Sequence, residues 1–305
     1  MNVKLGINTG FALNRFPMPE EWIPLVADKF GLEIVQFTAD LLNPGLPDDI
    51  IKDNILRLKK LSKDYKIQFK HSFTSAFTRV NHLAHPDPLL RKYWKNWFKK
   101  FVDISSELGA ESMGSHAGIF SVQNNNNQSI KEQRFMQVVD AWHDIAKYAK
   151  EKGIKYLTWE PMSIPREMGE TIEETKRIQK AFNENTVLPI KLCLDVDHGD
   201  VSSENPDDTD PYKWLEVFGK QTALLHIKQT FENKGGHWPF TREYNEQGKI
   251  TPKKLLDALN QSNVKDITLL LELSFREREP FESRVIDDIK ESIEYWRPFV
   301  NSPGA

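Results

Sequence analysis

Eight strand-like apolar runs alternate with segments of helical spacing along the 305 residues of the chain. Near-continuous apolar strands separated by helices are typical of a parallel sheet covered by helices, and eight such units close into a barrel. The order therefore predicts an α/β fold, a (β/α)8 barrel that forms a single domain over residues 1–305. The eight runs read VKLGIN, LEIVQFT, KIQFKHSF, AESMGSH, YLTWEPM, IKLCLDV, ALLHIKQ and ITLLLEL.

The segments between these runs carry the start and stop signals of helices. Asp87 and Asp210 each precede a proline, as N-caps do, and Gly109 and Gly153 follow the ends of two segments. A doubly wound open sheet is the structural alternative, but GINTGFALNR stands after the first strand in place of a G-x-G-x-x-G motif. We expect helices over residues 20–30, 47–65, 88–108, 129–152, 171–182, 211–218, 252–259 and 281–296.

Composition and net charge limit the class of partner and the cellular compartment that we expect. No window approaches the ~18 consecutive apolar residues of a membrane span. A net charge of −3 gives no reason to expect nucleic acid as the partner. The single Cys193 cannot form an internal disulfide, and MNVKLGINTG enters strand-like sequence without an apolar leader. We therefore expect a cytoplasmic protein with a small-molecule partner, and Cys193 buried in its apolar run.

Four of the later apolar runs end in side chains that bind metals: Glu160, Asp195, His226 and Glu272. In a parallel barrel every strand ends at the same mouth, so these four side chains converge. Each alone reads as a polar strand end satisfied by a nearby amide, but four together predict a metal site. Three carboxylates and one imidazole favour Mn²⁺, with Mg²⁺, Co²⁺ or Zn²⁺ as alternatives.

Two further histidines, His71 and His116, end the third and fourth strands and extend the polar ring of the same mouth. We expect both to be site residues that contact the substrate. The remaining histidines before the fifth strand, His82, His85 and His143, lie in a loop or on a helix and are expected to be ordinary surface or packing residues.

The series WEP, LDVDH, HIK and LLLEL, with the histidines of the third and fourth strands, resembles the xylose isomerase-like TIM barrel superfamily. Within it, the chain is similar to sugar epimerases and isomerases related to tagatose 3-epimerase. The stretches HWPFT and GINTGFALNR look like the erythrulose-phosphate (tetrulose phosphate) racemase branch. The resemblance implies Glu160, Asp195, His226 and Glu272 as metal ligands and His198 as a contact to a substrate oxygen.

The same resemblance implies a divalent-metal-dependent epimerase or isomerase of sugars or sugar phosphates. The favoured reaction is inversion of C3 in a short ketose phosphate through an enediolate that the cation stabilises. Glu160 and Glu272 would remove the proton from one face of the carbon and return one to the other. One departure is that the arginine usual after the seventh strand in this family has no clear counterpart.

Two long loops follow the third and seventh strands, over residues 72–87 and 228–249, and loops of this length at a catalytic face are usually functional. The loops after the seventh and eighth strands commonly hold a phosphate in such barrels. Solvated surface charge is the alternative explanation for each basic residue there. The candidates for phosphate or substrate contact are Lys234, Gly235, Gly236, His237, Arg242, Arg276 and Arg278.

Other functions stay open at this point. The same metal and carboxylates would serve an aldose-ketose or a hydroxypyruvate-type isomerase. An endonuclease IV-like repair enzyme would share many site positions, but Gly235, Gly236 and His237 stand where its Asp-x-His pair is needed. A non-catalytic sugar-binding barrel is the remaining alternative. A homo-oligomer is also compatible with the sequence, because an aromatic group on the third helix, Trp94, Trp97, Phe98 and Phe101, could form a dimer face or pack on the barrel.

Overall fold

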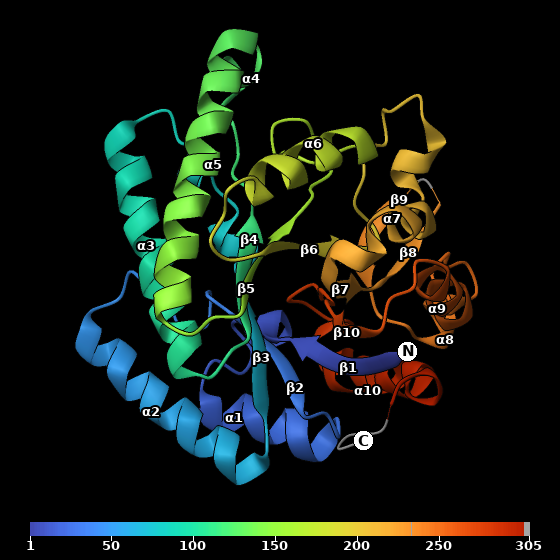
Figure 1. Cartoon of the computed structure of the whole chain (residues 1–305). Helices are drawn as coiled ribbons and strands as arrows, with labels where there is room; N and C mark the ends of the chain where they lie inside the picture. Colours follow the sequence, from blue (N-terminus) through green and yellow to red (C-terminus); the bar gives the residue numbers. More distant parts are fainter. Residues whose placement is uncertain (233, 302–305) are drawn as a thin grey trace.

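A closed barrel of eight parallel strands forms the centre of the computed structural model, which describes residues 1–232 and 234–301 (Figure 1). Around the barrel the strands follow one another in chain order, and β10 closes the ring against β1. The predicted (β/α)8 barrel is confirmed, and the doubly wound open sheet is wrong. The barrel strands are β1 (Asn2–Asn8), β2 (Ile34–Thr38), β3 (Gln68–Phe73), β4 (Ser112–His116), β5 (Tyr156–Glu160), β6 (Ile190–Asp195), β7 (Thr222–Ile227) and β10 (Asp266–Leu271).

Helices cover the outside of this barrel, and their bounds follow the predicted segments closely. Asp87 and Asp210 cap α3 and α7 as expected, each accepting a hydrogen bond from the backbone two residues on. The helices are α1 (Pro19–Pro24), α2 (Asp48–Tyr65), α3 (Pro88–Glu107), α4 (Val122–Asn125), α5 (Gln128–Glu151), α6 (Ile172–Asn183), α7 (Pro211–Phe218), α8 (Arg242–Asn245), α9 (Pro252–Gln261) and α10 (Val285–Trp296).

The long segment after β7 adds an element that the strand count did not predict. β8 (Gln229–Phe231) and β9 (Lys234–Trp238) pair antiparallel as a small hairpin outside the barrel sheet. Gln229 anchors this hairpin, because its side chain bonds Asn245 and the backbone of Thr230 and Ile250. The hairpin carries His237 to the barrel mouth.

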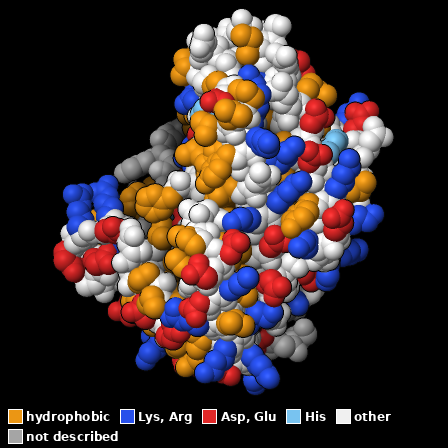
Figure 2. Space-filling view, turned by 90° about the vertical axis from the view of Figure 1, so that its left-hand side faces the viewer, with side chains coloured by type: hydrophobic (Ala, Val, Ile, Leu, Met, Phe, Trp, Pro, Cys, Tyr) orange, Lys and Arg blue, Asp and Glu red, His pale blue; other side chains and the backbone are white. Residues whose placement is uncertain are grey.

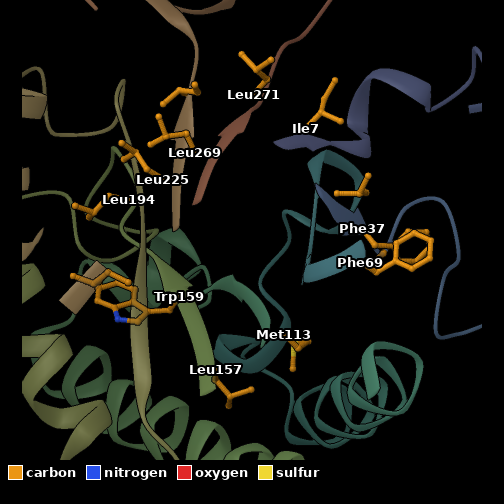
Figure 3. Close-up of a cluster of buried hydrophobic side chains, with 14 of the residues drawn as sticks. Ile7, Phe37, Phe69, Met113, Leu157, Trp159, Leu194, Leu225, Leu269 and Leu271 are labelled. Atoms are coloured by element: carbon orange, nitrogen blue, oxygen red, sulfur yellow. The ribbon is translucent and has the colours of Figure 1, made fainter. Parts of the chain in front are cut away.

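The main hydrophobic core lies between the barrel and its helices. Each barrel strand directs apolar side chains outward into this layer, among them Ile7 of β1, Met113 of β4 and Leu269 of β10 (Figure 3). The aromatic group on α3 belongs to it too: Trp97, Phe98 and Phe101 are buried within the chain itself. The packing role weighed for these residues is therefore confirmed.

The apolar core inside the barrel is smaller than the core between the barrel and its helices, and the side chains around it are more polar. A separate apolar cluster of Ile34, Phe73, Cys193, Leu224 and Leu270 fills part of the barrel interior. The predicted burial of Cys193 is confirmed. Close packing requires glycine at position 114, where a Cβ would meet the Phe73 ring at 2.5 Å and the Thr158 hydroxyl at 2.1 Å.

Strand register then brings the polar strand ends to one level of the barrel. His116 pairs with Glu160, and Asp195 pairs with His226. On the opposite side, Gln36 pairs with both Asn8 and His71. The mouth of the barrel is therefore ringed by side chains that can bind cations or polar ligands.

The outer surface shows no single-sign patch on the face drawn in Figure 2, where basic and acidic side chains alternate. Within the described residues, we find no helix with the length and apolar character needed to cross a bilayer.

Candidate metal centre and substrate cavity

The four predicted metal ligands come together at the barrel mouth. Glu160, Asp195, His226 and Glu272 each offer one ligand atom, and these atoms all lie within 4.8 Å of one another. The Nδ1 atom of His226 lies at their centre, 2.9 Å from Glu160 Oε1, 3.5 Å from Glu272 Oε1 and 3.9 Å from Asp195 Oδ2. Three side chains are buried and Glu272 is half-buried. The geometry is that of a cation site.

Hydrogen bonds fix the direction of the imidazole. His226 Nε2 lies 2.8 Å from Gln36 Oε1, an amide oxygen that also accepts from Asn8 Nδ2 at 2.7 Å. Because Gln36 Oε1 can only accept, Nε2 carries a hydrogen and Nδ1 faces the carboxylates. Nδ1 is therefore the atom of His226 that could bind a cation.

The electrostatics of the group also fit a cation. Burial lowers the pKa of His226, but the carboxylates of Glu272 and Glu160 outweigh it and hold that pKa well above its ordinary value. Burial raises the pKa of Glu272, but His226 and Lys228 outweigh it and hold that pKa below its usual range. Three carboxylates around one imidazole thus demand positive charge, and a divalent cation would supply it in place of the His226 proton.

Cys193 is a neighbour of this centre but a poor ligand for it. Its Sγ lies 3.4 Å from His226 Nε2. Burial raises the pKa of the thiol to about 12, so the sulfur stays protonated at neutral pH, whereas metal binding needs the thiolate. The oxygen-rich set of Glu160, Asp195, His226 and Glu272 is the better match to a hard divalent ion.

Lys228 is a member of the site that the sequence analysis did not assign. Its ammonium donates to Asp195 Oδ2 and, at 3.0 Å, to Glu272 Oε2, and the His237 ring lies 3.1 Å away. Its side chain is fully buried. Burial lowers the pKa of Lys228, but Asp195 and Glu272 outweigh it and raise that pKa above its ordinary value. The signal was the alternation along β7, which puts Lys228 on the same face as His226.

A cavity of about 430 Å³ opens above the centre, with Glu160 and Glu272 in its wall. Three of the predicted substrate contacts, His116, His198 and His237, also line it. His198 Nδ1 lies 2.8 Å from the carbonyl oxygen of Pro161 and 3.7 Å from Glu160 Oε1. The cavity and the metal-ligand set are therefore continuous.

His71 lies deeper than expected. It is fully buried inside the barrel, with Nδ1 2.9 Å from Ser112 Oγ, and it is not part of the cavity wall. Burial lowers its pKa to about 3, and the Lys70 and His226 charges add to this. His71 therefore supports the floor of the site as a neutral ring.

His82 lies closer to the site than its place in the sequence suggested. The loop after β3 folds over the mouth and buries His82 against His116, with ring centroids 4.1 Å apart and Nε2 3.1 Å from His116 Nδ1. The packing alternative weighed for His82 is therefore confirmed, and the residue it packs on is a cavity residue. His85 and His143 do make local contacts, to the Asp87 amide and the Phe182 carbonyl.

The predicted phosphate contacts differ in whether they reach the cavity. Arg242 is 91% exposed, pairs with Glu246, and lies on a separate surface hollow beside α10, so the structure does not bring it to the cavity. Arg276 and Arg278 are exposed and outside the cavity wall. The side chain of Lys234 lies outside the described part of the structure. The arginines in the wall are Arg15 and Arg79, from the loops after β1 and β3.

Comparison with known proteins agrees with this architecture. Residues 25–299 match the family model described as "Xylose isomerase-like TIM barrel". The chain is 37% identical over 303 residues to the D-erythrulose 1-phosphate 3-epimerase of Brucella abortus (strain 2308), which covers 99% of this chain and 98% of the relative.

Solved structures share the fold over nearly the whole chain. A putative xylose isomerase from Rhodospirillum rubrum superposes with a TM-score of 0.89 at 24% identity, covering 98% of this chain and 100% of the other. D-psicose 3-epimerase from Clostridium cellulolyticum H10 superposes with a TM-score of 0.71 at 16% identity, over 98% of this chain and 99% of the other. By its barrel, its strand-end carboxylates and these matches, the chain is an enzyme of the isomerase and epimerase class and belongs to the xylose isomerase-like TIM barrel family.

Proposed function

We propose that the protein is a metal-dependent 3-epimerase of a short ketose phosphate, with a tetrulose 1-phosphate as the favoured substrate. The observation that carries the proposal is the joint placement of Glu160 and Glu272 in the cation site and in the cavity wall. The 37% identity to a D-erythrulose 1-phosphate 3-epimerase over almost the full length supports the choice of substrate.

Glu160, Asp195, His226 and Glu272 would hold the cation. When bound, a divalent cation such as Mn²⁺ supplies positive charge next to the substrate carbonyl, which acidifies the neighbouring C–H. The ligand set fits Mn²⁺ best on its oxygen content, with Mg²⁺, Co²⁺ and Zn²⁺ as alternatives.

The two glutamates would then carry the proton. Glu160 ends β5 and Glu272 follows β10, with β6 and β7 between these strands around the barrel. The two carboxylates thus reach the cavity from separated positions, which suits removal of the C3 proton on one face and delivery on the other. His198, whose Nδ1 donates to the Pro161 carbonyl oxygen, would accept a hydrogen bond from a substrate hydroxyl at Nε2. His116 and His237 would complete the wall.

Arg15 is the cavity arginine best placed for the phosphate. Its side chain is 8% exposed, its Nε and Nη2 bind Glu282 and the Phe275 carbonyl, and within the described residues its Nη1 has no hydrogen-bond partner. A guanidinium with one free edge in a cavity wall can bind a phosphate oxygen. We therefore assign the phosphate to the loop after β1, where the sequence analysis had favoured the loops after β7 and β10.

The test is a substrate screen followed by proton NMR in deuterated buffer with added Mn²⁺. D-Erythrulose 1-phosphate should exchange its C3 hydrogen, seen by NMR, and form the enantiomer inverted at C3, seen by optical rotation, while unphosphorylated erythrulose should react at least about tenfold more slowly at equal concentration. Exchange at C1 of unphosphorylated erythrulose, with formation of an aldose, would favour the aldose-ketose alternative instead. Failure of every phosphorylated and free ketose to exchange would count against an epimerase.

A pair of arginine variants tests the phosphate assignment separately. Arg15→Ala should raise the KM for the phosphorylated substrate by at least about tenfold, in the range of a lost charged hydrogen bond. Arg242→Ala is the matched control, since Arg242 is exposed and outside the cavity. Equal KM values in both variants would contradict the assignment to Arg15.

A further inference from the structure

Lys228 makes the most unusual contacts of any charged residue in the site. It is fully buried, it lies two residues after the candidate ligand His226, and it donates to Asp195 and Glu272 together. Removing an ammonium from water costs several kcal/mol unless partners repay it. Packing alone therefore does not explain the presence of a charged group at this position.

The charge of Lys228 completes the balance of the site. Three carboxylates surround the cation position, and a divalent ion would leave one negative charge uncompensated. The ammonium of Lys228 removes that excess in a region where few water molecules can do so. Its hydrogen bonds go to Asp195, Glu272 and the His237 ring, and within the described residues none goes to His226 Nδ1.

The geometry is also asymmetric between the two glutamates. Lys228 holds Glu272 by Oε2, while Glu272 Oε1 is the oxygen 3.5 Å from His226 Nδ1. Glu160 Oε1 instead lies 2.9 Å from His226 Nδ1, and Lys228 donates no hydrogen bond to Glu160 in the described residues. One glutamate is therefore held by an ammonium, whereas the other has the imidazoles of His226 and His198 beside it.

We infer that Lys228 is a positioning residue that holds Glu272 for proton transfer on one face of the substrate and leaves the Glu160 face largely independent. It acts through Glu272, because Lys228 itself is not part of the cavity wall. The inference rests on the proposed two-glutamate epimerisation.

This asymmetry has a consequence that a merely structural lysine would not have. Each C3 epimer presents its hydrogen to only one of the two glutamates, so exchange of that hydrogen with solvent reports on one glutamate at a time. Loss of Lys228 should slow exchange from the epimer that Glu272 deprotonates more than exchange from the other epimer. A general collapse of the site would slow both by the same factor.

The experiment uses Lys228→Met, which keeps the length of the side chain and removes both charge and donors. Lys228→Gln, which keeps a donor without the charge, is the matched control. For wild type and both variants, C3 deuterium exchange is followed by NMR separately from each epimer of the substrate in Mn²⁺-containing deuterated buffer. Mn²⁺ affinity is measured in parallel by titration calorimetry, as a readout independent of turnover.

We expect Lys228→Met to change the ratio of the two exchange rates by at least tenfold, with Lys228→Gln between it and wild type. Mn²⁺ should still bind to both variants, because the four ligands remain. An unchanged ratio overturns the inference, as does failure of both variants to fold, which would make Lys228 a structural residue. Absence of exchange in the wild-type enzyme would instead overturn the proposed epimerisation, and the inference with it.

Discussion

Buried ionisable groups are neutral in one half of the barrel mouth and charged in the other half. The histidine half consists of His71, His82 and His116, from β3, β4 and the loop after β3. The carboxylate half consists of Glu160, Asp195, His226, Lys228 and Glu272, from β5, β6, β7 and the end of β10. Both halves are largely buried, yet only one of them is charged.

In the histidine half burial decides the charge. It lowers the pKa of His71 to about 3 and that of His116 to about 4, and it takes the pKa of His82 well below its ordinary value. Within the described residues, no carboxylate contacts the paired rings of His82 and His116. These rings are therefore neutral at physiological pH and can exchange hydrogen bonds with uncharged hydroxyls.

In the carboxylate half opposite charges outweigh burial. Burial raises the pKa of Asp195, but Lys228, His198 and His237 outweigh it and hold that pKa far below its usual range. The same balance keeps Glu272 ionised and Lys228 protonated. The carboxylate half is therefore suited to the proposed cation binding and proton transfer, while the histidine half gives the cavity a neutral wall through His116.

The largest expected effect comes from removing one proton carrier. Glu160→Gln or Glu272→Gln should lower epimerisation on the order of 10²- to 10⁴-fold, the usual contribution of a positioned acid or base. Turnover of the ketose phosphate is measured at saturating Mn²⁺, so that weakened cation binding does not limit it. Glu170→Gln is the matched control, because Glu170 is half-buried on the loop that follows β5 and lies outside the cavity. Equal losses of epimerase activity in all three variants would contradict the role of Glu160 and Glu272 as proton carriers.

A smaller effect is expected on cation affinity. Asp195→Asn should weaken Mn²⁺ binding on the order of 100-fold, because it removes a charged ligand. His116→Asn should leave the affinity within about threefold of wild type. Titration calorimetry on metal-stripped protein measures both. If His116→Asn weakened binding as much as Asp195→Asn, the histidine half would also hold a cation, and the division would be wrong.

The sequence predicted the part of this site that depends on barrel topology. Strand ends of a parallel barrel converge, so Glu160, Asp195, His226 and Glu272 could be brought together from their positions alone. Lys228 was also within reach of the β7 alternation, but a strand lysine is usually solvated, and only its burial beside Asp195 reveals its role.

Loop geometry was the part that the sequence could not predict. The burial of His82 depends on how the loop after β3 folds over β4, and no local periodicity encodes that path. The β8–β9 hairpin in turn brings His237 to the mouth, whereas Arg242 lies on α8, away from the cavity. Loops are irregular and their side chains follow tertiary contacts, so the sequence alone could show neither that Arg242 lies outside the cavity nor that His82 packs on His116.

The smallest expected effect tests the neutrality of the histidine half through stability. His116 lies against His82, Arg79 and the Thr78 carbonyl, and its folded pKa is about 4 against ~6.5 in the unfolded chain. Between these values the unfolded chain binds more protons than the folded protein. His116 should therefore cost no stability above pH 6.5 and destabilise the fold progressively as the pH falls toward 4.

At pH 5 this linkage amounts to about 2 kcal/mol relative to pH 8. Urea unfolding of wild type and His116→Asn at both pH values isolates it, because all other titrating groups are shared. Wild type should lose about 2 kcal/mol more than the variant on going from pH 8 to pH 5. Equal losses would mean that the folded protein accepts a proton on His116. The wall facing the substrate would then be cationic, and His116 would become a competitor of Arg15 for the phosphate.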